Sequence, residues 1–96
     1  MLFMVTFDIH PGCLHDALAA FAGMGEEGDA ALMGGSLKLI GRWHDLVAGG
    51  GVAIFEADSA EDLAAYALHW NGSMDLEIKP ILDDAGARAV AARMPT

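Results

Sequence analysis

The sequence predicts an α+β fold of the ferredoxin-like type, in which two helices pack on one face of a four-stranded antiparallel sheet. Alternating apolar residues mark four strands, and helical spacing marks the segments between them. The resulting order is strand, helix, strand, strand, helix, strand, helix, for which the expected sheet order is 4-1-3-2. The 96 residues suffice for one domain, residues 1–96, with an extra helix at the C-terminal end.

The first half of the chain contains a strand and a helix. Residues 2–9 alternate apolar and mixed side chains, and the His10-Pro11-Gly12 stretch ends this strand. Apolar residues at helical spacing predict a helix over residues 13–24. The segment 25–35, GEEGDAALMGG, is acidic and interrupted by glycine, so we expect a loop that includes one helical turn.

The second half begins with a β-hairpin. Its strands are predicted over residues 36–44 and 51–57, joined through a glycine-rich turn. Asp58 and Ser59 are good N-caps for a helix that runs to about Trp70. A fourth strand covers residues 74–79, and Pro80 indicates that it lies at a sheet edge or ends there. Asp83 and Asp84 start the last helix.

The composition limits the possible partners. A net charge of −9, from 14 acidic and five basic residues, disfavours nucleic acid and anionic membrane surfaces. Apolar runs are too short for a membrane span, the start lacks a signal-peptide pattern, and Cys13 is the single cysteine, so we expect a cytoplasmic protein. With 54% hydrophobic residues, a chain this small is expected to form a homodimer that covers part of its apolar surface.

Strand alternation assigns side chains to the two faces of the sheet. One set, expected to face the helices, is apolar: Phe3, Val5, Phe7, Leu37, Leu39, Trp43, Ala53, Phe55, Leu76 and Ile78. The other set, expected on the open face, mixes apolar and charged residues: Met4, Thr6, Asp8, Lys38, Ile40, Arg42, His44, Val52, Ile54, Glu56, Asp75, Glu77 and Lys79. Such a mixed face suits a cavity that a second molecule closes.

The segments KLIGRWHD, VAIFEADSAEDLAAYALHW and DLEIKPILDD resemble a family of short bacterial proteins catalogued only as a domain of unknown function. The resemblance covers nearly the whole chain, with a GRWHD motif at Gly41–Asp45 and an EAD motif at Glu56–Asp58; the segment 25–35 is longer and more irregular than the family pattern. It implies a dimeric α+β barrel, in which two sheets pack with their open faces together. It implies no activity.

The predicted site lies at one end of the open face. There Asp8, Arg42, His44 and the start of the fourth strand, Asp75, are expected to meet. The imidazole titrates near neutrality and the guanidinium can bind a carboxylate, so we expect a small acid or carbonyl compound whose apolar part packs against Met4 and Ile40. The alternative is a set of internal cross-strand ion pairs. Both tryptophans, Trp43 and Trp70, are expected in the core.

No metal or cofactor is expected. His10, Cys13 and His15 lack a fourth ligand nearby and match no zinc spacing, and Gly49–Gly51 lacks the lysine and helix of a phosphate loop. Three classes of function stay open: a binding module for a small partly apolar molecule, a cofactor-free enzyme of oxygenase or isomerase type with His44 as acid or base, and a structural dimer without a ligand.

Overall fold

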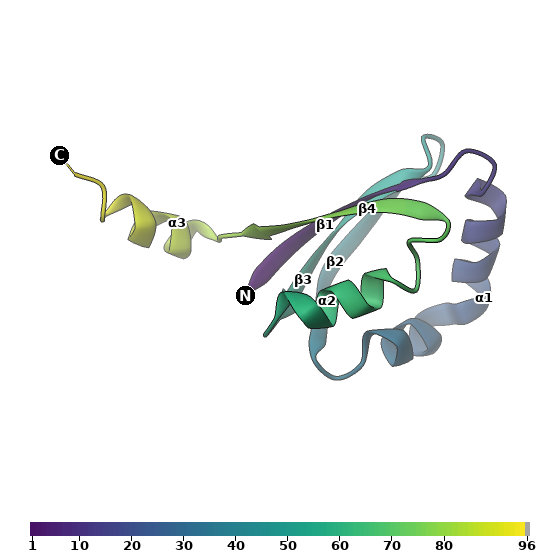
Figure 1. Cartoon of the computed structure of the whole chain (residues 1–96), viewed down its shortest axis with the longest axis horizontal. Coiled ribbons are helices and arrows are strands. Elements are labelled where there is room, and N and C mark those ends of the chain that lie inside the picture. The colour runs from purple at the N-terminus through teal and green to yellow at the C-terminus, as the bar shows by residue number, and fades with distance from the viewer. Residues whose placement is uncertain (96) are drawn as a thin grey trace.

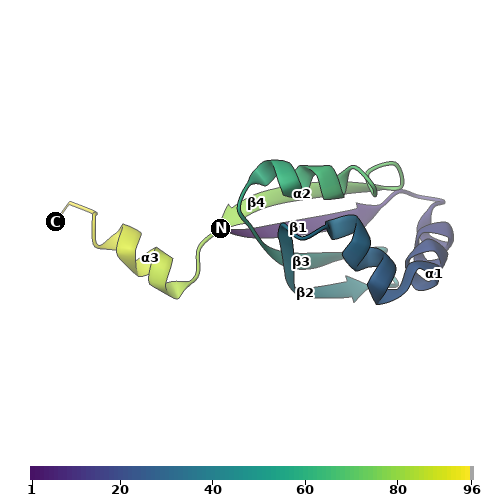
Figure 2. The ribbon, with the colours of Figure 1, turned by 90° about the horizontal axis from the view of Figure 1, so that it is seen from below.

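A computed structural model describes residues 1–95 and confirms the predicted α+β fold. The elements are β1 (Leu2–Ile9), α1 (Leu14–Met33), β2 (Leu37–Asp45), β3 (Gly50–Ala57), α2 (Ala60–Ala67), β4 (Met74–Ile81) and α3 (Asp84–Ala91). The four strands form one antiparallel sheet in the order β2-β3-β1-β4, which is the predicted 4-1-3-2 from the other edge. Helices α1 and α2 lie on one side of the sheet, while α3 projects away from it (Figures 1 and 2).

The core forms where alternating residues of the central strands meet α2. Phe3 and Val5 of β1 pair in register with Phe55 and Ala53 of β3, so all four point to the helices and are buried. Leu63 of α2 packs onto them and is almost fully buried. The N-terminus of α2 is fixed by Ser59, whose Oγ accepts a hydrogen bond from the Asp62 backbone N–H at 3.3 Å.

Residues 25–35 are not the expected loop. Helix α1 continues to Met33, with a kink at Gly25, whose φ of 65° lies in the left-handed region that glycine adopts without strain. The segment after the kink resumes helical geometry and ends at Gly34. Both halves of α1 therefore lie on the helix side of the sheet, and the second half brings Asp29 to a buried position.

A β-bulge in β2 makes part of the predicted face assignment wrong. Leu39 of β2 pairs with Phe55 of β3, and Gly41 pairs with Ile54, the neighbour of Phe55. Ile40 is therefore an extra residue without a partner in β3. One inserted residue exchanges the two faces for everything after it, because side chains alternate with period two. Arg42 and His44 consequently face the helices, and Trp43 lies on the open face, 60% exposed rather than in the core.

The C-terminal helix stands apart from the body. β4 is an edge strand, as Pro80 predicted, and α3 follows it with Asp83 as N-cap, whose carboxylate accepts a hydrogen bond from the Gly86 backbone N–H at 2.8 Å. The radius of gyration is 15.4 Å, whereas a compact chain of this length has about 12.5 Å. The difference reflects the projecting segment in Figure 1.

Candidate functional site

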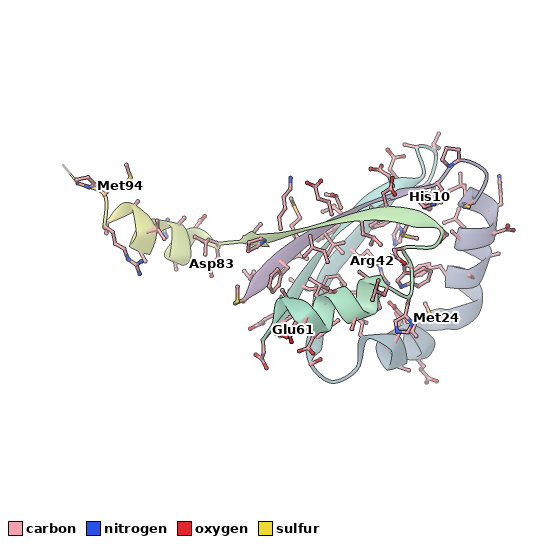
Figure 3. The ribbon with its side chains drawn as sticks, viewed as in Figure 1. His10, Met24, Arg42, Glu61, Asp83 and Met94 are labelled. Carbon is pink, nitrogen blue, oxygen red and sulfur yellow. The ribbon has the colours of Figure 1, made fainter. Side chains whose placement is uncertain are left out.

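A buried polar cluster joins β2 to both covering helices. The Arg42 Nη2 donates a hydrogen bond to Asp29 Oδ2 at 2.6 Å, and the Tyr66 hydroxyl donates to Asp29 Oδ1, also at 2.6 Å. Arg42 Nη1 donates in turn to the Tyr66 hydroxyl oxygen at 3.2 Å. The Arg42 side chain therefore points from the sheet towards the helices (Figure 3).

The cluster is electrically neutral and strongly constrained. The Asp29 carboxylate is only 4% exposed, and the charge of Arg42 compensates it directly. Burial, followed by the hydrogen bond to Asp29, raises the pKa of Tyr66 from 10.0 to about 12, so the phenol keeps its proton. Phe21 of α1 lies against the guanidinium, with the Arg42 Cζ 4.7 Å from its ring centroid.

His44 lies beside this cluster in an aromatic setting. Its ring centroid is 5.8 Å from that of Phe7 and 5.2 Å from that of Phe21. The residue between His44 and Phe7 in the sheet register is Gly51, where an added Cβ would collide with the Phe7 ring. Desolvation, together with the positive charge of Arg42, lowers the pKa of His44 below 6.5, so the imidazole is neutral at pH 7. The residue as a whole is nevertheless exposed to solvent.

A cavity of about 70 Å³ lies between the sheet, α1 and α2, next to His44 and Arg42. Its walls are mostly apolar and come from all four strands and both helices. Trp70, just after α2, also lines it, and its buried Nε1 has no hydrogen-bond partner within residues 1–95. Trp70 is near Tyr66 and acts to lower the Tyr66 pKa, against the larger effects that raise it. The geometry between the Trp70 Nε1–H and the Tyr66 hydroxyl is nevertheless not that of a hydrogen bond. The residues that line the cavity thus include a tryptophan with an unsatisfied N–H donor and a histidine with a neutral imidazole.

The residues predicted to form one site are divided between the two faces. Arg42 and His44 line the cavity, whereas Met4 lies on the open face, in register with Ile54. Ile40 is at the bulge and 51% exposed. The prediction that Met4 and Ile40 line the same pocket as Arg42 and His44 is therefore wrong, because the bulge was not recognisable from alternation alone.

The two predicted aspartates also lie on the open face. Asp8 and Asp75 are direct partners across β1 and β4, and His10 bonds to Asp75 with Nε2 to Oδ1 at 2.9 Å. Figure 3 shows His10 just past the end of β1. Neither aspartate lines the cavity.

Sequence reasoning missed Asp29, the central acid of the cluster. It lies in the segment that was expected to be a loop, so no contact with β2 could be predicted from it. A usable signal is the scarcity of cations: an arginine in a strand of so acidic a chain needs a carboxylate partner, and Asp29 is the acid that starts the helix-forming DAALM stretch.

Among residues 1–95, no group of three or more His, Cys, Asp or Glu side chains is placed to hold a metal ion. Within the same part of the chain, no helix combines the length and apolarity that crossing a bilayer requires.

The fold and topology define a ferredoxin-like α+β domain with a C-terminal helical extension. The chain belongs to the family described as a domain of unknown function (DUF3303), which matches residues 1–95 and confirms the family resemblance. A similar solved structure is an uncharacterized NIPSNAP domain protein from Burkholderia xenovorans, with 16% identity, a TM-score of 0.47 and coverage of 88% of this chain and 97% of that one. Comparison with curated proteins finds no match.

Proposed function

We propose that the protein binds a small, partly apolar carbonyl compound in the cavity beside His44. The observation that carries this proposal is Trp70, which lines this mostly apolar cavity and whose buried Nε1–H has no partner within residues 1–95. A buried donor left without an acceptor costs about 1–3 kcal/mol, so an acceptor oxygen in the cavity would recover this free energy.

A neutral carbonyl fits better than a carboxylic acid, the other class expected from the sequence. Arg42 is already engaged by Asp29 and Tyr66, so the cavity has no free cation to compensate a ligand carboxylate. His44 is neutral at pH 7 because its pKa is lowered. Burying an uncompensated carboxylate there would be unfavourable.

The size of the cavity limits the ligand. At roughly 10–15 Å³ for each water, about 70 Å³ holds about five waters. We therefore expect a ligand of about five non-hydrogen atoms, with its oxygen towards Trp70 and its carbon chain against the aromatic walls. Butanone has this size and chemistry.

The test is an NMR titration of the two indole N–H resonances. Butanone should shift the Trp70 resonance and leave that of Trp43, on the open face, unchanged. Propionate serves as the acid matched in size and shape and should shift Trp70 far less at pH 7. A stronger response to propionate, or no movement of the Trp70 resonance with either compound, would refute the proposal.

A homodimer is the second part of the proposal. On the open face Trp43 and Ile40 are 60% and 51% exposed, and Met4, Val52 and Ile54 lie beside them in the sheet register. Four strands of eight residues present a face of about 26 by 19 Å, so two faces together bury roughly 1,000 Å², the lower range for a specific interface.

We propose that the second copy packs with a two-fold axis along the strands. Such an axis places β4 of one copy antiparallel to β2 of the other, so both sheet edges can pair and an eight-stranded barrel closes. A barrel of this size has an interior that side chains fill, which suits Trp43 and its neighbours. Gly41 lets the Trp43 indole lie flat over the strand, since an added Cβ would collide with the ring.

Replacement of Ile54 by aspartate tests this interface. The charge would be buried at the centre of the packed faces, so the variant should be a monomer by light scattering at micromolar concentration while the wild type is a dimer. Glu77→Gln, at the edge of the same face, is the matched control and should remain dimeric. A monomeric wild type would refute the dimer.

A cofactor-free enzyme with His44 as base is favoured by one observation. The neutral imidazole is partly exposed at the cavity, where it could take a proton from a carbon next to a bound carbonyl. Exchange of the butanone α-hydrogens with deuterium would measure this activity, and His44→Gln should abolish it. If the wild type exchanges no faster than the His44→Gln variant, the enzyme proposal is refuted and only the binding function is kept. We also propose a cytoplasmic location, supported by the free thiol of Cys13.

A further inference from the structure

The C-terminal segment carries an apolar stripe that the body of its own chain does not cover. Leu82, Val90 and Met94 are 63%, 48% and 68% exposed, and Gly86 lies under the Leu82 side chain. Val90 lies in α3, whereas Leu82 precedes the N-cap Asp83 and Met94 follows the helix end at Ala91; these three exposed apolar side chains form the stripe. We refer to residues 82–95 as the arm; Figure 3 shows it extending from Asp83 to Met94, away from the sheet.

An arm of this kind needs a surface to pack on. Helix α3 has eight residues, and isolated helices shorter than about 12 residues are only marginally stable in water. Its N-cap at Asp83 and the long contact between Arg88 and Asp84, 4.0 Å on the exposed surface, add little. Packing of the apolar stripe is the remaining source of stability.

Charge identifies an acidic partner. The arm contains two aspartates at its start and Arg88 and Arg93 towards its end, so its own charge is zero and residues 1–81 carry the entire −9. The end of the arm is therefore the cationic part of an acidic molecule. A second copy of this chain presents the complementary surface.

We propose that the arm of each protomer binds the second copy, in the groove between the second half of α1 and the edge strand β2. This groove has a volume of about 530 Å³, and its lining combines apolar side chains with charged ones: Phe21, Ala22, Met33, Leu39, Glu26, Asp29 and Arg42. Glu27, exposed like Glu26, lies next to Glu26 in α1. The stripe matches the apolar lining, and Arg88 and Arg93 match the two glutamates.

The connection of the strands makes this reach feasible. β4 ends with Ile81 at the same end of the sheet where β2 begins. Neighbouring strands are paired across this end of the sheet as follows: Ile81 with Leu2, Leu2 with Glu56, and Glu56 with Lys38. A two-fold axis along the strands keeps these ends together and places the end of β4 beside the start of β2 of the copy. The arm then leaves β4 next to the groove, and this placement rests on the proposed dimer.

A substitution pair tests the arm in the intact chain. Val90→Asp should weaken dimerisation about tenfold in sedimentation, because an apolar contact is replaced by a charge next to Glu26 of the copy. Ala85→Asp, on the opposite side of α3, should leave the dissociation constant within twofold. Equal effects of the two substitutions would overturn the docking of the stripe.

Cysteine pairing locates the contact. In a Cys13→Ala chain that carries Val90→Cys and Met33→Cys, oxidation should give a covalent dimer, whereas an arm folded back on its own body gives a cross-linked monomer. If the wild type is a dimer but no covalent dimer forms and Val90→Asp leaves the dissociation constant unchanged, the docking of the arm on the second copy is refuted. The proposed packing of the two sheets is then retained. A monomeric wild type overturns both proposals.

Discussion

The two faces of the sheet differ in where their charged groups lie: buried and compensated on the helix side, and exposed to solvent on the open face. On the helix side, Arg42 is removed from water but fully compensated by Asp29 and Tyr66, so a charged group becomes part of the core. On the open face the charges stay exposed, and the large apolar side chain of Trp43 is exposed with them. The helices cover the first face except at the cavity, whereas the second face leaves the apolar side chains of Ile40 and Trp43 exposed.

The single residue that separates these two environments is Ile40. Without the bulge, Arg42 and His44 would lie on the open face and Trp43 in the core, as strict alternation predicts. The bulge therefore decides which side chains meet Asp29 and which lie on the open face. It changes the direction of three neighbouring side chains at once, those of Arg42, Trp43 and His44.

Insertion of one alanine between Gly41 and Arg42 should have the largest effect. The insertion would move Arg42 to the open face and Trp43 to the helix side, so the buried Asp29 carboxylate loses its compensating charge and an indole takes its place. We expect a loss of at least about 4 kcal/mol in the free energy of unfolding, measured by denaturant titration. Ile40→Ala, which keeps the register and removes a half-exposed side chain, should cost about 1 kcal/mol or less. Similar values for both variants would contradict the role of the bulge.

Removal of one partner of the buried pair should have the next largest effect. Asp29→Ala leaves the Arg42 guanidinium with only Tyr66, and the free energy of unfolding should fall by about 3 kcal/mol. The double variant Asp29→Ala, Arg42→Met should regain much of this loss, because no charge is then buried. A double variant less stable than the single one would show that the pair is not the cause.

Alkaline pH should destabilise the same cluster. The pKa of Tyr66 is raised in the folded state from 10.0 to about 12, so the folded chain holds this proton more tightly than the unfolded chain. The contribution is fully present below pH 10 and is lost as the pH rises from 10 to about 12, by about 1.4 kcal/mol per pH unit. Thermal unfolding of wild type and Tyr66→Phe at pH 9, 10 and 11 measures it. The difference between the two proteins should change with pH only above pH 10, and a constant difference would exclude the effect.

The fold could be predicted because its signals are local and repeated. Alternation in β1 and β3, the caps Ser59 and Asp83, and Pro80 at an edge strand each agree with the structure. The buried cluster could not be predicted, since it depends on two interruptions of regular patterns. Gly25 kinks α1 without ending it, and Ile40 shifts β2 by one residue. Each changes the direction of many side chains through one backbone position. The spacing of apolar residues in the sequence does not reveal where such a position lies.

Fluorescence of the Trp70→Phe protein, in which Trp43 is the one remaining tryptophan, tests the division between the two faces most directly. The account predicts a shielded Trp43 with blue-shifted emission at micromolar concentration, and a shift to the red on dilution as the open faces separate. Emission that stays red-shifted at every concentration would mean that the open face has no partner. Emission that stays blue-shifted on dilution, at concentrations where light scattering finds only monomer, would mean that Trp43 is buried in its own chain and that the bulge does not place it on the open face.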